Sequence, residues 1–191
     1  KTEVMLQQPR DKHTIQDPTI YLETRTGEKV MLKVVQEFKY LGLIITNDNS
    51  ANRDITKRIS QAAAAFAKYK RTFVNRYVSL KRKVALYKII VQTSLLQCIG
   101  IRCLLKEDVD RLEAFQYRSL RSICVWSKVD FKSYNDVYER SGCWSVTTLI
   151  SRERIMWASK VYSLENYRIP KILVMRKNMK RVSEHQTFNM E

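Results

Sequence analysis

The side chains that most often carry out chemistry in proteins are few in this chain of 191 residues. The two histidines, His13 and His185, lie near opposite ends, and the four cysteines form no C-x-x-C pair, so no metal site is predicted. Asp108 and Asp110 could pass for a paired-carboxylate metal site, but residues two apart on a helix point away from each other. With no Gly-rich phosphate loop and no nucleophile–base spacing, we expect no catalytic residue and no small-molecule substrate.

Positive charge is the most distinctive property of the sequence. The formal net charge is +16 and the isoelectric point is near 9.8. Eleven lysines or arginines fall between Ala51 and Ile90, against a single acid, Asp54. Such a concentrated excess predicts an anionic partner, with nucleic acid first and an anionic membrane surface second. The alternative is a basic face that is merely solvated.

Two amphipathic helical patterns would position these cations. In the first, apolar residues from Ile55 to Phe73 recur at spacings of four and three, after a cap at Ser50 or Asn52. In the second, Ser79 caps a helix that runs to Leu95, and the three cations in its first turn oppose the helix dipole unless a phosphate binds there. The cations opposite the apolar stripe of the first helix are Arg53, Lys57, Lys68 and Arg71. The residues we expect to contact nucleic acid are Arg53, Lys57, Arg58, Lys68, Arg71, Lys81, Arg82 and Lys83.

The rest of the pattern predicts an α+β fold that is mainly helical. A β-hairpin is expected over residues 19–32, with its turn at Thr26-Gly27, and one or two further strands reach residue 45. Later helices begin at Lys106, Ser133 and Val146. No apolar run approaches the ~20 residues of a membrane span, and no secretory signal is recognised. The cysteine pattern indicates a reduced setting, so we expect an intracellular protein of the nucleus or cytoplasm that is not integral to a membrane.

The chain also resembles the end of the palm and the thumb of reverse transcriptases from non-LTR (LINE-type) retrotransposons. The resemblance covers nearly the whole chain, because its blocks follow the family's order and spacing. The blocks are Lys1-Thr2-Glu3-Val4-Met5, Phe38-Lys39-Tyr40-Leu41-Gly42, Ile55-x-x-Arg58-Ile59, Leu80-x-x-Lys83-x-x-x-Tyr87-x-x-x-Val91, Arg111-Leu112-Glu113-Ala114-Phe115-Gln116, Leu120-Arg121-Ser122-Ile123, Val137-Tyr138-Glu139-Arg140-Ser141-Gly142 and Arg168-Ile169-Pro170-Lys171.

This resemblance implies an RNA-directed DNA polymerase whose catalytic Mg²⁺ ions are held by an Ala-Asp-Asp box in a palm upstream of residue 1. The box is absent from these 191 residues. The chain alone is therefore expected to be inactive, to need no cofactor of its own, and to have the rest of a reverse transcriptase polypeptide as a partner. The lack of an initiator Met suggests such a fragment.

The resemblance also assigns roles along the chain. Residues 1–46 would end the palm, 47–128 would form a thumb-like helical bundle, and 129–191 would form a helical extension with a basic tail. An RNA–DNA hybrid or RNA template–primer is the implied nucleic acid, recognised mainly through its shape and phosphates. The primer grip, the turn that positions the primer end, would be Phe38, Lys39, Tyr40, Leu41 and Gly42.

Two segments depart from the family's pattern. Residues 95–102 lack its Leu-Leu-Tyr-Gly followed by an acid and a Trp, and residues 156–160 lack its Arg-Trp-x-Gly-His. These departures fit a second interpretation, a decayed or co-opted retroelement fragment that serves as a protein-interaction or general RNA- and DNA-binding module.

Overall fold

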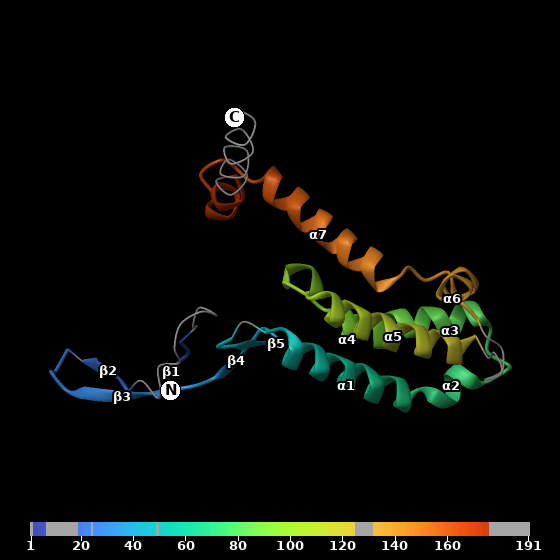
Figure 1. Ribbon diagram of the computed structural model, residues 1–191, viewed down its shortest axis with the longest axis horizontal. Helices are drawn as coiled ribbons and strands as arrows, with labels where there is room; N and C mark the ends of the chain where they lie inside the picture. The colour runs from blue at the N-terminus through green and yellow to red at the C-terminus, as the bar shows by residue number, and fades with distance from the viewer. Residues whose placement is uncertain (1, 7–18, 24, 49, 125–131, 176–191) are drawn as a thin grey trace, which may run out of the picture. The chain divides into compact units, whose positions relative to one another are not determined.

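The computed structural model describes residues 2–6, 19–23, 25–48, 50–124 and 132–175 (Figure 1). The fold is α+β and mainly helical, with short strands first and helices after them, as the sequence predicts. The chain divides into two compact units: residues 1–97 with 102–146, and residues 98–101 with the chain from 147 onward. The part of the basic tail beyond residue 175 lies outside the described residues.

The first three strands form one small sheet in the order β1-β3-β2. The predicted hairpin is confirmed: β2 (Ile20–Glu23) pairs antiparallel with β3 (Lys29–Val34). β1 (Glu3–Val4) lies parallel to β3 on its other side, where Lys33 Nζ reaches Glu3 Oε1 at 3.1 Å. Side chains alternate between the two faces of a strand. One face of this sheet is therefore apolar throughout, with Val4, Ile20, Leu22, Val30, Leu32 and Val34.

A second hairpin leads into the helices. β4 (Glu37–Tyr40) pairs antiparallel with β5 (Leu43–Thr46), with Tyr40 opposite Leu43. The two connecting residues, Leu41 and Gly42, have φ values of 47° and 89°. Two positive φ angles identify a type I′ turn, the connection that matches the twist of paired strands. No described atom lies within 4 Å of the position that a Cβ would take at Gly42, so the positive φ is what favours glycine there.

The first cationic pattern folds into two helices, not one. α1 (Asn52–Lys68) and α2 (Lys70–Val74) are separated at Tyr69, whose carbonyl accepts hydrogen bonds from two amides of the next turn. Ile55, Ala62 and Phe73 of the apolar stripe are buried, and Ile59, Phe66 and Tyr69 are half-buried. The Phe66 and Phe73 rings stack across the break at 4.9 Å. At the start of α1 the residue in the cap position is Ala51, and the Ser50 hydroxyl accepts from the Asn52 amide at 3.3 Å.

The second cationic pattern continues as one helical segment of changing pitch. It comprises α3 (Leu80–Tyr87), the π-helical η1 (Lys88–Gln92), α4 (Thr93–Leu96) and the 3₁₀ turn η2 (Ile99–Ile101). Tyr87, Val91 and Leu95 follow one another at spacings of four. In a regular α-helix, side chains four apart shift gradually around the axis, whereas a wider π turn keeps them on one face. All three are completely buried.

The same segment bears on the expectation that the chain is not integral to a membrane, which stays a prediction. Residues 80–101 are long and apolar enough to cross a membrane by length and composition, with a mean hydropathy of 1.6. This is weak information about a membrane, because the core helix of a globular bundle meets the same criterion. Val84, Tyr87, Val91 and Leu95 of this segment are buried side chains of the first unit.

Three more labelled helices follow, and residues 169–175 at the end of the described chain are helical as well. α5 (Lys106–Ile123) packs against α1, α2, α3 and α6, so it forms the centre of the helical part of the first unit (Figure 1). α6 (Tyr134–Ser141) begins with a capping box between Ser133 and Asp136. It ends at Gly142, whose φ of 63° is the left-handed conformation that commonly terminates a helix. α7 (Val146–Ser163) begins where the sequence predicts.

Gly100 of η2 packs closely against α7 within the second unit. A Cβ at this position would lie 2.8 Å from Glu153 Cβ and 3.2 Å from the Glu153 carbonyl carbon of α7. We expect Gly100→Ala to destabilise the contact between η2 and α7 by about 1–3 kcal/mol, because helix backbone must move. Faster proteolysis within residues 147–175, with Gly27→Ala as the surface control, would show this; unchanged cleavage would contradict it.

Candidate nucleic-acid interface

Six of the eight predicted phosphate-binding cations lie at the surface of the first unit. Arg58 and Lys83 do not: they are only 5% and 4% exposed, so they cannot belong to a solvent-facing binding surface as the sequence led us to expect. The six at the surface are Arg53, Lys57 and Lys68 of α1, Arg71 of α2, and Lys81 and Arg82 of α3.

Arg58 is buried because it serves an internal ion cluster. Its Nε donates to Asp54 Oδ2 at 2.7 Å, one helical turn away, and its Nη1 donates to the Gln97 carbonyl. Arg102 Nη2 lies 3.4 Å from the same Asp54 oxygen. Burying a charge is tolerated when it is paired and hydrogen-bonded, and both conditions hold here.

This cluster leaves the outer surface of α1, α2 and α3 purely cationic. Asp54, the only acid between residues 51 and 90, is 1% exposed, and the structure describes that whole stretch. Cations outside the predicted set extend the surface, and one of them, Lys88, also donates to the Gly142 carbonyl at 3.1 Å. These additional exposed cations are Lys70, Arg76 and Lys88. We call these residues, together with the six above, the cationic surface; Lys57 is half-buried and the others are exposed.

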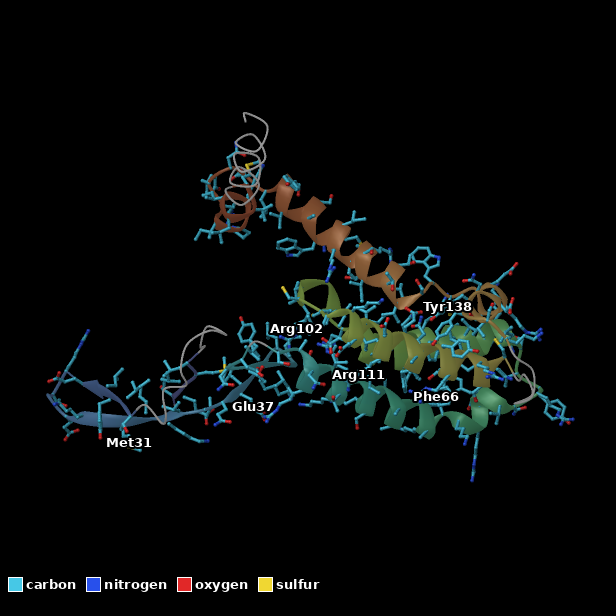
Figure 2. All side chains as sticks on the ribbon, viewed as in Figure 1. Met31, Glu37, Phe66, Arg102, Arg111 and Tyr138 are labelled. Atoms are coloured by element: carbon cyan, nitrogen blue, oxygen red, sulfur yellow. The ribbon has the colours of Figure 1, made fainter. Side chains whose placement is uncertain are left out.

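Two contacts add residues from other elements to the start of α1 (Figure 2). Arg111 of α5 donates to Asn52 Oδ1 at 2.6 Å and to Thr56 Oγ1 at 2.7 Å, so a further cation lies on the first turns of α1. Glu37 of β4 pairs with Arg53 at 2.7 Å. Both partners are more than half exposed, and such pairs contribute only about 0–1 kcal/mol, so a phosphate can compete for Arg53.

Open hollows lie along this end of α1. One, of about 390 Å³, is lined by Asn52, Arg53, Thr56, Lys57, Ser60 and Gln61. A second, of about 170 Å³, shares Asn52 and Arg53 and continues over the loop before the helix, lined also by Gln36, Thr46, Asn47, Asp48 and Ser50. Amide and hydroxyl groups beside arginine and lysine are the groups that contact sugars and phosphates in protein–nucleic acid complexes. The first hollow therefore suits a nucleic-acid backbone, whereas the exposed carboxylate of Asp48 in the second would repel phosphate.

The primer-grip-like residues form the tip of the β4–β5 hairpin. Phe38, Tyr40 and Leu41 are 42%, 56% and 78% exposed, and Lys39 is exposed as well. Large apolar side chains at a turn are unusual, and a leucine with positive φ is costly, by about 1–3 kcal/mol. These residues cost the hairpin some stability, which favours a role for the tip in contacting another molecule.

Replacing Leu41 tests this interpretation directly. Leu41→Asn should leave the unfolding free energy unchanged or raise it by up to about 1 kcal/mol, because asparagine is favoured at the first position of a type I′ turn. The same change should weaken binding to a hybrid with a free 3′ end. Urea denaturation and fluorescence titration would measure the two effects, and a loss of stability would contradict the first.

Acid is expected to open the Asp54 cluster. Burial raises the pKa of Asp54, but the Ile44 amide, Arg58 and Arg102 together outweigh it and hold the pKa below its ordinary value. Stability from this group is therefore fully present above the unfolded pKa of about 3.9 and falls as the pH drops through the lower folded value. Urea denaturation from pH 7 to 3 should show a steeper loss for the wild type than for Asp54→Ala, and parallel curves would contradict the assignment.

Residues considered for chemistry take structural positions. Asp108 is buried and its Oδ2 accepts from the Leu105 amide at 3.3 Å at the start of α5, whereas Asp110 is exposed. No group of three His, Cys, Asp or Glu that could hold a metal occurs within the described ranges.

Comparisons with protein-family models, with curated proteins and with solved structures give no match.

Proposed function

We propose that this chain is the primer-grip, thumb and post-thumb portion of a LINE-type reverse transcriptase, a clamp for template–primer duplex without an active site of its own. The observation that carries the proposal is the cationic surface, which exposes no carboxylate of its own between residues 51 and 90. A solvated helix face usually mixes charges of both signs, so a surface of one sign favours a polyanion.

The arrangement suits recognition of shape and backbone. α1, α2 and α3 present cations from three helices, and the hollows at the start of α1 add neutral hydrogen-bonding groups. No described feature provides a base-reading helix or ribbon. An RNA–DNA hybrid offers phosphates and sugar hydroxyls across a wide, shallow groove, which such a surface fits. The exposed tip at Tyr40 and Leu41 would contact the primer end.

Catalysis would belong to the larger polypeptide. The family's Mg²⁺ ligands lie in a palm box that these 191 residues do not contain. Within the nucleus or cytoplasm, the chain would act by holding the duplex while the palm transfers nucleotides. The apolar face of the β1–β3–β2 sheet is the surface on which the rest of the polymerase would pack.

Salt dependence of binding tests the proposal. Affinity for an RNA–DNA hybrid should fall linearly with salt on logarithmic axes, and a surface that neutralises several phosphates should give a slope of several times about −0.9, the value per phosphate on B-DNA. Phosphate contacts are strong at salt concentrations of about 50–100 mM. An affinity that does not change with salt, or no binding at those concentrations, would overturn the proposal.

A protein-interaction module is the second candidate. Exposed apolar side chains on α7 and in the residues that follow it, up to the helical stretch 169–175, favour this function, because exposed apolar patches often mark protein-binding surfaces. They include Ile155, Met156, Trp157, Tyr162, Tyr167, Ile169 and Leu173. Salt-insensitive association with a protein, together with a flat nucleic-acid titration, would favour this candidate over the clamp.

A further inference from the structure

The outer edge of β5 is held by side chains and not by another strand. Ile44, in the middle of β5, donates its amide to Asp54 Oδ1 at 3.0 Å. Its carbonyl accepts a hydrogen bond from Arg102 Nη2. Both polar backbone groups of one residue are thus engaged by two charged side chains from distant parts of the sequence.

The two side chains are themselves linked. Arg102 Nη2 lies 3.4 Å from Asp54 Oδ2, and the same oxygen accepts from Arg58 Nε at 2.7 Å. Arg58 continues to the Gln97 carbonyl at the end of α4. The buried carboxylate of Asp54 on α1 is therefore linked to β5 through Ile44, to the residue after η2 through Arg102, and, by way of Arg58, to Gln97 before η2. Figure 2 shows Arg102 beside the start of α1.

We propose that Asp54 and Arg102 are positioning residues, which hold the β4–β5 tip in a fixed orientation to α1 by clamping Ile44. Ile44 is two residues from Gly42 and the clamp lies at the first turn of α1, so motion of the tip relative to the cationic surface must break it. The inference rests on the proposed function. It adds that a primer end at Tyr40 and Leu41 is aligned with the duplex on α1 through this ion cluster.

Arg102 offers the cleaner variant, because it lies at the rim of the cluster with its side chain 14% exposed, whereas Asp54 is central. Its Nη2 atom makes both contacts, with the Ile44 carbonyl and with Asp54. A lysine ammonium is a single point of charge and can replace one such atom, so Arg102→Lys should preserve the clamp where Arg102→Gln breaks it. Arg118→Gln is the matched control, since Arg118 is exposed on α5 and bonds within its own helix, to the Ala114 carbonyl.

The test compares two probes, an RNA–DNA hybrid with a recessed 3′ end and the same hybrid closed by loops at both ends. The wild type should prefer the open end, and Arg102→Gln should lower this preference by about tenfold, the equivalent of one lost contact of about 1.4 kcal/mol. Affinity for the closed hybrid should not change. Arg102→Lys and Arg118→Gln should both keep the wild-type ratio, and exchange of the Ile44 amide should accelerate only in Arg102→Gln.

The outcomes separate the two ideas. If the wild type binds neither hybrid, the proposed function is overturned and the positioning role with it. If both hybrids bind and Arg102→Gln leaves the ratio unchanged, or weakens both equally, the clamp is only a fold contact and the inference alone is wrong. Restoration of the ratio by lysine supports it, because a loss of general stability would not change one probe selectively.

Discussion

Reversing three cations of the cationic surface, with Lys57→Glu, Lys68→Glu and Arg71→Glu together, is expected to weaken binding to an RNA–DNA hybrid by roughly a hundredfold or more at low salt, and to reduce the salt slope by about three. These side chains lie on α1 and α2 where no carboxylate of the same stretch is exposed. Each reversal removes one phosphate contact and adds repulsion. Fluorescence anisotropy over a salt series would measure both quantities.

A second triple variant separates local contact from overall charge. This control combines Lys106→Glu, Arg118→Glu and Arg140→Glu, which change the net charge by the same amount as the first triple variant. All three positions are exposed; Lys106 and Arg118 lie on α5 and Arg140 lies on α6. We expect this control to lose less than about tenfold, since charges outside the contact act mainly through long-range steering. Equal losses in the two variants would show that only the total charge matters and would remove the assigned surface.

Replacing Asp54 with alanine is expected to destabilise the first unit by about 3–5 kcal/mol, the usual effect of removing one partner from a buried ion pair. Two effects contribute. The guanidinium groups of Arg58 and Arg102 would remain inside without their carboxylate, and the Ile44 amide would lose its acceptor. Because native domains are stable by only about 5–15 kcal/mol, the variant should unfold far more readily in urea.

Asp110 provides the comparison for this prediction. It is an exposed aspartate on α5, and Asp110→Ala should change stability by no more than about 0.5 kcal/mol. If Asp54→Ala and Asp110→Ala have similar urea midpoints, the Asp54 cluster contributes little and the Ile44 clamp loses its physical basis.

The burial of Arg58 and Lys83 could have been predicted from spacing alone. At about 100° per residue, Arg58 lies about 60° from Ile55, within the apolar stripe of α1, and Asp54 precedes it by four residues. Lys83 similarly lies about 40° from Tyr87 on α3. Charge led us to count both residues with the surface cations, although the helical geometry placed them near the core.

Other features depend on contacts that a local pattern does not contain. Arg111 reaches Asn52 across 59 residues, and Gly100 meets Glu153 across a similar distance in the sequence. The break at Tyr69 and the π turn at residues 88–92 arise because tertiary packing selects among local geometries of similar energy. The strand and helix order, by contrast, followed from hydrophobic period and turn residues, which act locally.

The contact of Gly100 with α7 has a consequence for dividing the protein into pieces. The second unit takes four residues, Cys98–Ile101, from the middle of the chain and joins them to the chain that begins at Thr147. A cut after residue 146 would therefore leave η2 without its partner helix, and a peptide starting at 147 would lack η2. Each cut therefore separates η2 from the helix that it contacts, and a piece meant to keep the second unit has to include both segments.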